Sequence, residues 1–119
     1  MELELFAGLP VSDYARAVDW YERLLGSPAT FQAHETECVW TLAERRSIYI
    51  ELEPEHAGHA RVTFFPEDLD RFVAAAVSRG VHPDRTETYE NSVRKITFSD
   101  PDGNEIGVGG VVAEPSQAP

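Results

Sequence analysis

Apolar residues recur at the three- and four-residue spacing of an amphipathic helix in two segments of the chain. The first segment covers residues 14–25 and the second covers residues 69–77. Ser12 or Asp13 precedes the first segment and can accept hydrogen bonds from the free backbone N–H groups at a helix start. A glycine follows each segment closely and permits the left-handed conformation in which many helices end. The pattern therefore predicts two helices.

Segments with alternating apolar and polar residues surround both predicted helices, as is typical of strands with one buried face. Residues 48–52 alternate clearly, and we expect residues 38–42 to pair with them through a turn at residues 43–46. Near the C-terminus, the sequence DPDGN at residues 100–104 is a dense turn signal between two further strand patterns. The other predicted strands cover residues 3–9, 61–65, 95–98 and 105–108, with weaker candidates around residues 32–33 and 86–88.

The predicted elements occur in the same order twice: a strand, a helix and three more strands. A faint sequence repeat accompanies this order. At an offset of 55 residues, Asp13, Arg16 and Val18 correspond to Asp68, Arg71 and Val73. We therefore predict an α+β fold of two βαβββ modules, at about residues 1–53 and 58–112, within one domain at 1–112. Residues 113–119 lack apolar anchors, and we expect them to be a disordered tail.

The composition is that of a folded globular domain, because 42% of the 119 residues are hydrophobic and 26% are charged. Only 10 Lys and Arg residues oppose 21 Asp and Glu residues, so the formal net charge is −11. This excess repels phosphate backbones and anionic lipids, so we expect neither a nucleic-acid partner nor a membrane partner. It would favour a cationic ligand, although acidic surfaces usually serve only solubility.

The sequence also bears on cellular location and on cysteine chemistry. No apolar run approaches the roughly 18 residues that cross a bilayer. The N-terminal MELELF lacks the basic and apolar regions of a signal peptide, so we expect a cytoplasmic protein. Cys38 is the only cysteine, which excludes an internal disulfide and a multi-cysteine metal site. It lies in a predicted strand, and we expect it to be buried rather than catalytic.

Four short motifs lie within this repeated element order: LPVSD at residues 9–13, WY at 20–21, LLG at 24–26 and FSDPDGNEI at 98–106. With them the chain resembles the vicinal oxygen chelate superfamily over residues 3–111. That group contains glyoxalase I, the bleomycin resistance proteins and the extradiol dioxygenases. The resemblance implies that each module curls into half of an open barrel, with helices outside and a ligand cavity inside. It also implies a homodimer.

The resemblance further implies where metal-dependent relatives hold their ion, with one ligand on each of four strands. The matching positions in this chain are Phe6, Glu51, Arg61 and Gly107. Only Glu51 has a suitable ligand atom, since Arg61 is cationic and would repel the ion. A displaced set of Glu51, His59 and Glu105 would need several shifts in strand register at once. We therefore expect no metal cofactor, with a divalent metal as the alternative.

Strand alternation predicts which side chains face the cavity. If an apolar set that includes Leu3, Leu5 and Leu52 packs under the helices, the intervening residues face the other way. Pairing across the turn at residues 43–46 would add Trp40 to the cavity face. The aromatic members of this face could stack on a planar ligand, and the charged members could fix its polar ends. The predicted ligand-binding residues are Phe6, Trp40, Tyr49, Glu51, Arg61, Phe65 and Lys95.

The resemblance and the acidic charge together favour metal-independent binding or sequestration of a small planar, cationic molecule, as in the bleomycin resistance proteins. The alternative is a glyoxalase-like or dioxygenase-like enzyme. In that case Glu51 would be a metal ligand, or a general base assisted by Arg61 or Lys95. A third alternative is a regulatory or assembly module whose cavity is filled by its own side chains.

Overall fold

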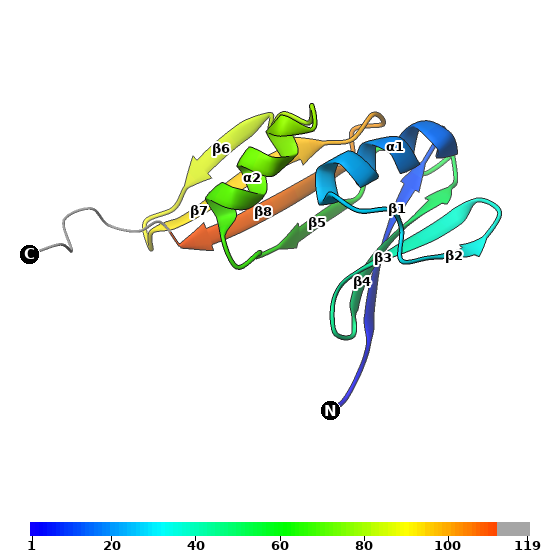
Figure 1. Cartoon of the computed structure of the whole chain (residues 1–119), viewed down its shortest axis with the longest axis horizontal. Coiled ribbons are helices and arrows are strands. Elements are labelled where there is room, and N and C mark those ends of the chain that lie inside the picture. Colours follow the sequence, from blue (N-terminus) through cyan, green and yellow to red (C-terminus); the bar gives the residue numbers. More distant parts are fainter. Residues whose placement is uncertain (112–119) are drawn as a thin grey trace, which may run out of the picture.

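In a computed structural model that describes residues 1–111, the chain folds into two four-stranded sheets, each with one helix packed on it (Figure 1). The predicted tail at residues 113–119 lies outside the described residues. The elements in chain order are β1 (Leu5–Val11), α1 (Tyr14–Leu25), β2 (Phe31–His34), β3 (Glu37–Ala43), β4 (Arg46–Leu52), β5 (Arg61–Phe64), α2 (Leu69–Ser78), β6 (Arg85–Thr88), β7 (Val93–Ser99) and β8 (Glu105–Val111).

The two sheets have the same topology, which confirms the two predicted βαβββ modules. The strand orders are β1-β4-β3-β2 in the first module and β5-β8-β7-β6 in the second. In each module the first strand pairs in parallel with the last, and the other pairs are antiparallel. A parallel pair needs a long crossover, which the helix and the intervening strands supply. The two sheets do not join into a closed barrel.

Both helices begin at an aspartate that accepts a hydrogen bond from the backbone three residues later. The Asp13 side chain accepts from the Arg16 N–H at 3.1 Å, and the Asp68 side chain accepts from the Arg71 N–H at 3.0 Å. The sequence repeat thus includes the residues that start each helix. Gly26 ends α1 with a φ of 81°, which favours glycine. Among residues 1–111, no helix is long and apolar enough to span a membrane.

Each helix buries one face of its sheet. Beneath α1, strands β1 and β4 bury Leu9 and Ile50 completely. In the second module the Phe72 ring of α2 meets the Phe98 ring of β7 edge-on, with centroids 6.5 Å apart. The opposite side of each sheet has no helix on it. We call that side the open face of the sheet.

The prediction that Leu3, Leu5 and Leu52 pack under the helices is wrong. Leu3 and Leu5 are 57% and 58% exposed, whereas Leu9 is fully buried. The helix α1 is too short to cover the whole sheet. It covers the part around Leu9, and the start of β1, where Leu5 lies, extends past the helix. Leu52 is the last residue of β4 and is likewise exposed. The end of this sheet where Leu5 pairs with Arg46 therefore has no helix over it.

The DPDGN turn connects β7 and β8, as predicted, and it also joins the two modules. The buried Asp100 carboxylate accepts the Tyr21 hydroxyl of α1 at 2.8 Å. Its other oxygen accepts the backbone N–H groups of Asp102 and Asn104, each at 2.9 Å. Burial, together with the negative charge of Asp100, raises the pKa of Tyr21. The hydroxyl therefore stays protonated and acts as a donor.

Asn104 completes this connection with four hydrogen bonds. Its Nδ2 group donates to the Pro10 carbonyl of β1 at 2.7 Å and to Asp100 at 2.8 Å. Its Oδ1 atom accepts the backbone N–H groups of Gly58 and Ala60, in the segment that links the modules. The side chain is fully buried, so each polar atom needs these partners. We call Tyr21, Asp100 and Asn104 the inter-module latch.

Candidate functional site

The open face of the first sheet brings together three of the predicted ligand-binding residues, Phe6, Tyr49 and Glu51. Tyr49 and Glu51 alternate along β4 with residues buried under α1, so their side chains lie on the opposite side. Phe6 occupies the same face of the neighbouring strand β1 and is 44% exposed. This face therefore combines aromatic rings with a carboxylate.

Gly8 permits the Tyr49 ring to lie across β1. The two residues pair directly, and a Cβ atom at Gly8 would lie 2.5 Å from the Tyr49 hydroxyl oxygen. Any larger residue at this position would push the ring away. Because Phe6 and Gly8 lie two residues apart on one strand, Tyr49 and Phe6 are neighbours on the open face.

Sequence reasoning missed Phe31, His34 and Glu37, which lie at the same face. Phe31 pairs with Val39, which in turn pairs with Tyr49, and its ring is 46% exposed. His34 pairs with Glu37, which pairs with Glu51. The signal was the short β2–β3 hairpin at residues 34–37, because its tight turn sets the register of both strands. Recognition of that hairpin would have placed His34 opposite Glu37, but not Phe31 on this face, because the register shifts between Gln32 and His34.

His34, Glu37 and Glu51 form one polar cluster at the end of this face. The His34 Nε2 atom lies 3.0 Å from a Glu37 carboxylate oxygen and 3.7 Å from a Glu51 carboxylate oxygen. The Thr36 N–H donates to His34 Nδ1 at 3.3 Å, so the proton of a neutral imidazole belongs on Nε2. His34 then donates to Glu37. The cluster holds two carboxylates and one imidazole, so its carboxylates outnumber its basic groups and this end of the face is electronegative.

Three other predicted residues, Arg61, Phe65 and Lys95, lie on the second module. Arg61 and Lys95 are on the open face of the second sheet, and Lys95 Cε would lie 2.6 Å from a Cβ at Gly107. The Phe65 ring lies against Gly109 in the same way. The glycines of β8 thus let two large side chains lie flat on the sheet. Arg61 and Lys95 give this face positive charge.

Glu105 offsets part of that positive charge. Its carboxylate accepts from the Arg85 guanidinium at 3.1 Å and lies 3.6 Å from the Arg61 Nε atom. The hydrogen bond from Arg85 lowers the pKa of Glu105, and the charges of Arg85, Arg61 and Lys95 lower it further. Lys95 itself forms no ion pair with any residue in the described range 1–111. Among residues 1–111, Lys95 is therefore the cation of this open face that has no carboxylate within ion-pair distance.

The prediction that Trp40 shares the open face with Tyr49 is wrong. A β-bulge lies between Thr41 and Ala43, so Trp40 pairs with Ile48 instead of Tyr49. A one-residue shift moves a side chain to the other face of the sheet. Trp40 therefore packs on the helix side, where it is 2% exposed and its indole N–H donates to the Ser27 carbonyl at 3.0 Å.

The chain does not close its two open faces around a common cavity. Strands of the first sheet do not pair with strands of the second. Phe6, Tyr49 and Glu51 therefore form one group, and Arg61, Phe65 and Lys95 form another. The six residues are thus divided between the two sheets.

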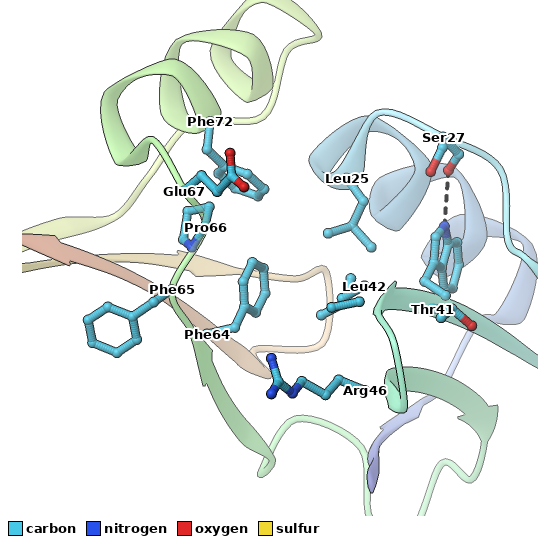
Figure 2. A pocket seen from close by; sticks show the side chains of 12 residues that line it. Leu25, Ser27, Thr41, Leu42, Arg46, Phe64, Phe65, Pro66, Glu67 and Phe72 are labelled. Carbon is cyan, nitrogen blue, oxygen red and sulfur yellow. Dashed lines mark hydrogen bonds between the residues drawn. The ribbon is translucent and has the colours of Figure 1, made fainter. Parts of the chain in front are cut away.

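A hollow of about 900 Å³ lies elsewhere, between the modules on their helix side (Figure 2). We call it the inter-module groove. Its walls come from the end of α1, the β3–β4 hairpin, the end of β5 and the start of α2. Apolar side chains predominate, and Arg46 and Glu67 supply the charges. The apolar lining residues are Leu25, Trp40, Leu42, Ala43, Phe64, Phe65, Pro66 and Phe72.

A comparison with protein families gives a match that covers almost the whole fold. The model of the Glyoxalase/Bleomycin resistance protein/Dioxygenase superfamily matches residues 5–108. The chain belongs to this superfamily. A comparison with curated proteins found no match.

Solved structures of this superfamily fold agree with the assignment. A glyoxalase/bleomycin resistance protein from Catenulispora acidiphila is 52% identical, with a TM-score of 0.90, and the match covers 93% of this chain and 100% of that one. An antibiotic-binding protein from a Streptomyces species is 26% identical, with a TM-score of 0.71 and coverage of 94% and 98%. A bleomycin-binding protein complexed with bleomycin shares the fold at 18% identity, with a TM-score of 0.75 and coverage of 93% and 100%.

The positions that match the superfamily's metal ligands do not fit a metal in this chain. Phe6 and Gly107 have no donor atom, and Arg61 is a cation beside Glu105. Glu51 has a ligand atom, but it lies on the first sheet, whereas Arg61 and Gly107 lie on the second. The displaced set of Glu51, His59 and Glu105 is not among the groups of ligand atoms that gather within residues 1–111; His34, Glu37 and Glu51 are, with ligand atoms within 4.8 Å of one another.

Proposed function

We propose that this protein binds and sequesters a small planar, cationic molecule without a metal cofactor. The observation that supports the proposal is the first open face, where Tyr49 lies between Phe6 on one side and Glu51 on the other. A planar ligand can stack on the two rings while its positive group approaches the carboxylate. The Streptomyces relative, which binds an antibiotic, supports a small molecule as the ligand class.

The charge of this face favours a cation over a neutral molecule. Glu37 and Glu51 are opposite each other on adjacent strands, where like charges repel. His34 is the imidazole beside these two carboxylates, 3.0 Å from Glu37 and 3.7 Å from Glu51. A ligand cation would relieve the repulsion, and half-burial of both carboxylates reduces the screening of that attraction.

A homodimer is part of this proposal. A single chain leaves both open faces uncovered, with exposed rings such as Phe6 and Phe31 on the first. The electronegative first face and the more positive second face are complementary in charge. Association of two copies, first face against second face, would bury the rings and bring Lys95 and Arg61 of one copy to the site of the other, where they would bind a polar end of the ligand while Glu51 binds its positive group. The shared cavity would then contain all six residues.

Calorimetric titration with a panel of planar cations and their uncharged analogues tests the proposal. We expect saturable binding of at least one cation, and at least tenfold weaker binding of its uncharged analogue. Tyr49→Ala and Glu51→Gln should each weaken binding about tenfold. The matched controls Tyr89→Ala and Glu90→Gln alter exposed residues between β6 and β7 and should have no effect on binding. No binding across the panel, or equal binding of charged and uncharged forms, would contradict it.

The His34–Glu37–Glu51 cluster favours one second candidate, a glyoxalase-like or dioxygenase-like enzyme that uses Glu51. Its three ligand atoms lie close enough to share an ion. Elemental analysis of the purified protein separates the candidates. The sequestration proposal predicts far less than one metal ion per chain and unchanged ligand binding after chelation. One ion per chain, lost in Glu51→Gln, would favour the enzyme.

A further inference from the structure

The inter-module groove is a consequence of the short reach of α1. The helix side of the first sheet continues past the end of α1, and residues there have no helical cover. Arg46, at the start of β4, occupies this uncovered part on the same side as Ile48. The second module faces it across the groove with Phe64 and Pro66 (Figure 2). The groove therefore lies on the side of the first sheet opposite Tyr49 and Glu51.

We propose that the inter-module groove binds a planar apolar molecule that bears an anionic group, with Arg46 as the counter-ion. The groove volume of about 900 Å³ is within the range of small-molecule sites. Aromatic rings form one wall, since Phe64 and Phe72 meet edge-on with centroids 5.7 Å apart. Leu42 and Leu25 lie opposite them (Figure 2), and Leu42 is 37% exposed. The walls suit an aromatic ring system.

The charge of the ligand follows from Arg46. Its neighbour Arg45 is paired with Glu2 at 3.1 Å, whereas Arg46 forms no ion pair with any residue of the described part of the chain. A guanidinium group binds a carboxylate or sulfonate through two parallel hydrogen bonds. Glu67 lines the far end of the groove, near Phe72 and away from Arg46 (Figure 2). It would accept a hydrogen bond from a donor at the other end of the ligand.

This site is separate from the one in the proposed function. The two lie on opposite sides of the first sheet and share only Phe65, which the groove proposal does not use, and their predicted ligands have opposite charge. Failure of planar cations to bind at Tyr49 would therefore leave the groove proposal intact, and the reverse also holds.

Fluorescence titration with anilinonaphthalene sulfonate tests the groove, because this probe joins a planar apolar ring system to an anion and an N–H donor. Trp40 lines the groove, so energy transfer from tryptophan to the bound probe should accompany binding. We expect saturation at one probe per chain. Arg46→Gln should weaken binding about tenfold, the usual effect of losing a charged hydrogen-bonded partner. Arg16→Gln removes the same charge from an exposed position of α1 and should leave affinity unchanged.

A second probe tests the charge without any variant. Phenylnaphthylamine has the same aromatic system but lacks the sulfonate, and it should bind the unaltered protein about tenfold more weakly. Leu42→Gln should weaken both probes, because it places a polar group on the apolar wall. Equal affinity for the two probes, equal effects of Arg46→Gln and Arg16→Gln, or loss of binding in Tyr49→Ala would overturn the proposal.

Discussion

The Tyr21 hydroxyl in the first module donates a hydrogen bond to the buried Asp100 carboxylate in the second, at 2.8 Å. The two residues are 79 positions apart in the chain. Asp100 and Asn104 belong to the DPDGN turn, so a motif that reads as a hairpin signal also fixes how the modules meet. The relative placement of the two open faces and of the groove depends on this latch.

Tyr21→Phe should lower the free energy of unfolding by about 1–3 kcal/mol, because it removes a hydrogen bond to a buried charged group. Asp100 keeps its bond from Asn104, so the fold should persist. Urea unfolding measures the change. Tyr89→Phe is the control, since this exposed hydroxyl should contribute less than about 0.5 kcal/mol. Equal effects of the two substitutions would argue against a stabilising role of the latch.

Asn104→Asp should be more harmful than Tyr21→Phe. The substitution places a second carboxylate against Asp100 and the Pro10 carbonyl, where the amide now donates to both. An uncompensated buried charge typically destabilises a protein by about 3–5 kcal/mol. Asn91→Asp makes the same chemical change in an exposed turn, where the side chain accepts a hydrogen bond from the Val93 N–H that a carboxylate can also accept. A loss below about 1 kcal/mol for Asn104→Asp would contradict the described geometry.

The pKa of Glu105 should respond to Arg85. The Arg85 hydrogen bond holds this pKa below its usual value of 4.5, so the pair contributes stability above that pH. The contribution is lost as the pH falls through the lowered pKa. An NMR titration of the carboxyl carbon should show a rise in the Glu105 pKa in Arg85→Gln. Arg61→Gln should raise it less, because Arg61 acts only through its charge. An unchanged pKa in Arg85→Gln would exclude the pair.

Cys38 should be unreactive in the folded protein. Burial raises the pKa of its thiol, and the side chain is 3% exposed, so both thiolate formation and access are limited. A thiol-reactive chromogenic disulfide should therefore react at least tenfold more slowly with native protein than with urea-unfolded protein. Comparable rates in the two states would show that the strand around Cys38 opens readily.

Much of the fold could be predicted from local pattern. Apolar spacing gave both helices, and the Asp13–Asp68 repeat marked their starts because the two aspartates make equivalent capping bonds. Alternation placed Tyr49 and Glu51 on the open face correctly. These features depend on residues close together in the chain, which is where sequence patterns are informative.

The wrong predictions concern residues whose face or burial depends on a strand irregularity or on parts of the chain far away in sequence. A bulge beside Trp40 reverses the face of that residue, and nothing in the alternation of residues 38–42 reveals it. Leu5 has the spacing of a core residue, but its burial depends on how far α1 extends over the sheet. Whether two open faces share a cavity depends on module placement, and the inter-module groove likewise joins residues from both halves.

A crystal structure of the protein with a planar cation from the binding panel tests the central claim most directly. The account predicts the ligand ring against Tyr49 and Phe6, its positive group nearest Glu51, and no metal ion at the site. A ligand bound elsewhere, or a metal ion held by Glu51 between ligand and protein, would contradict it.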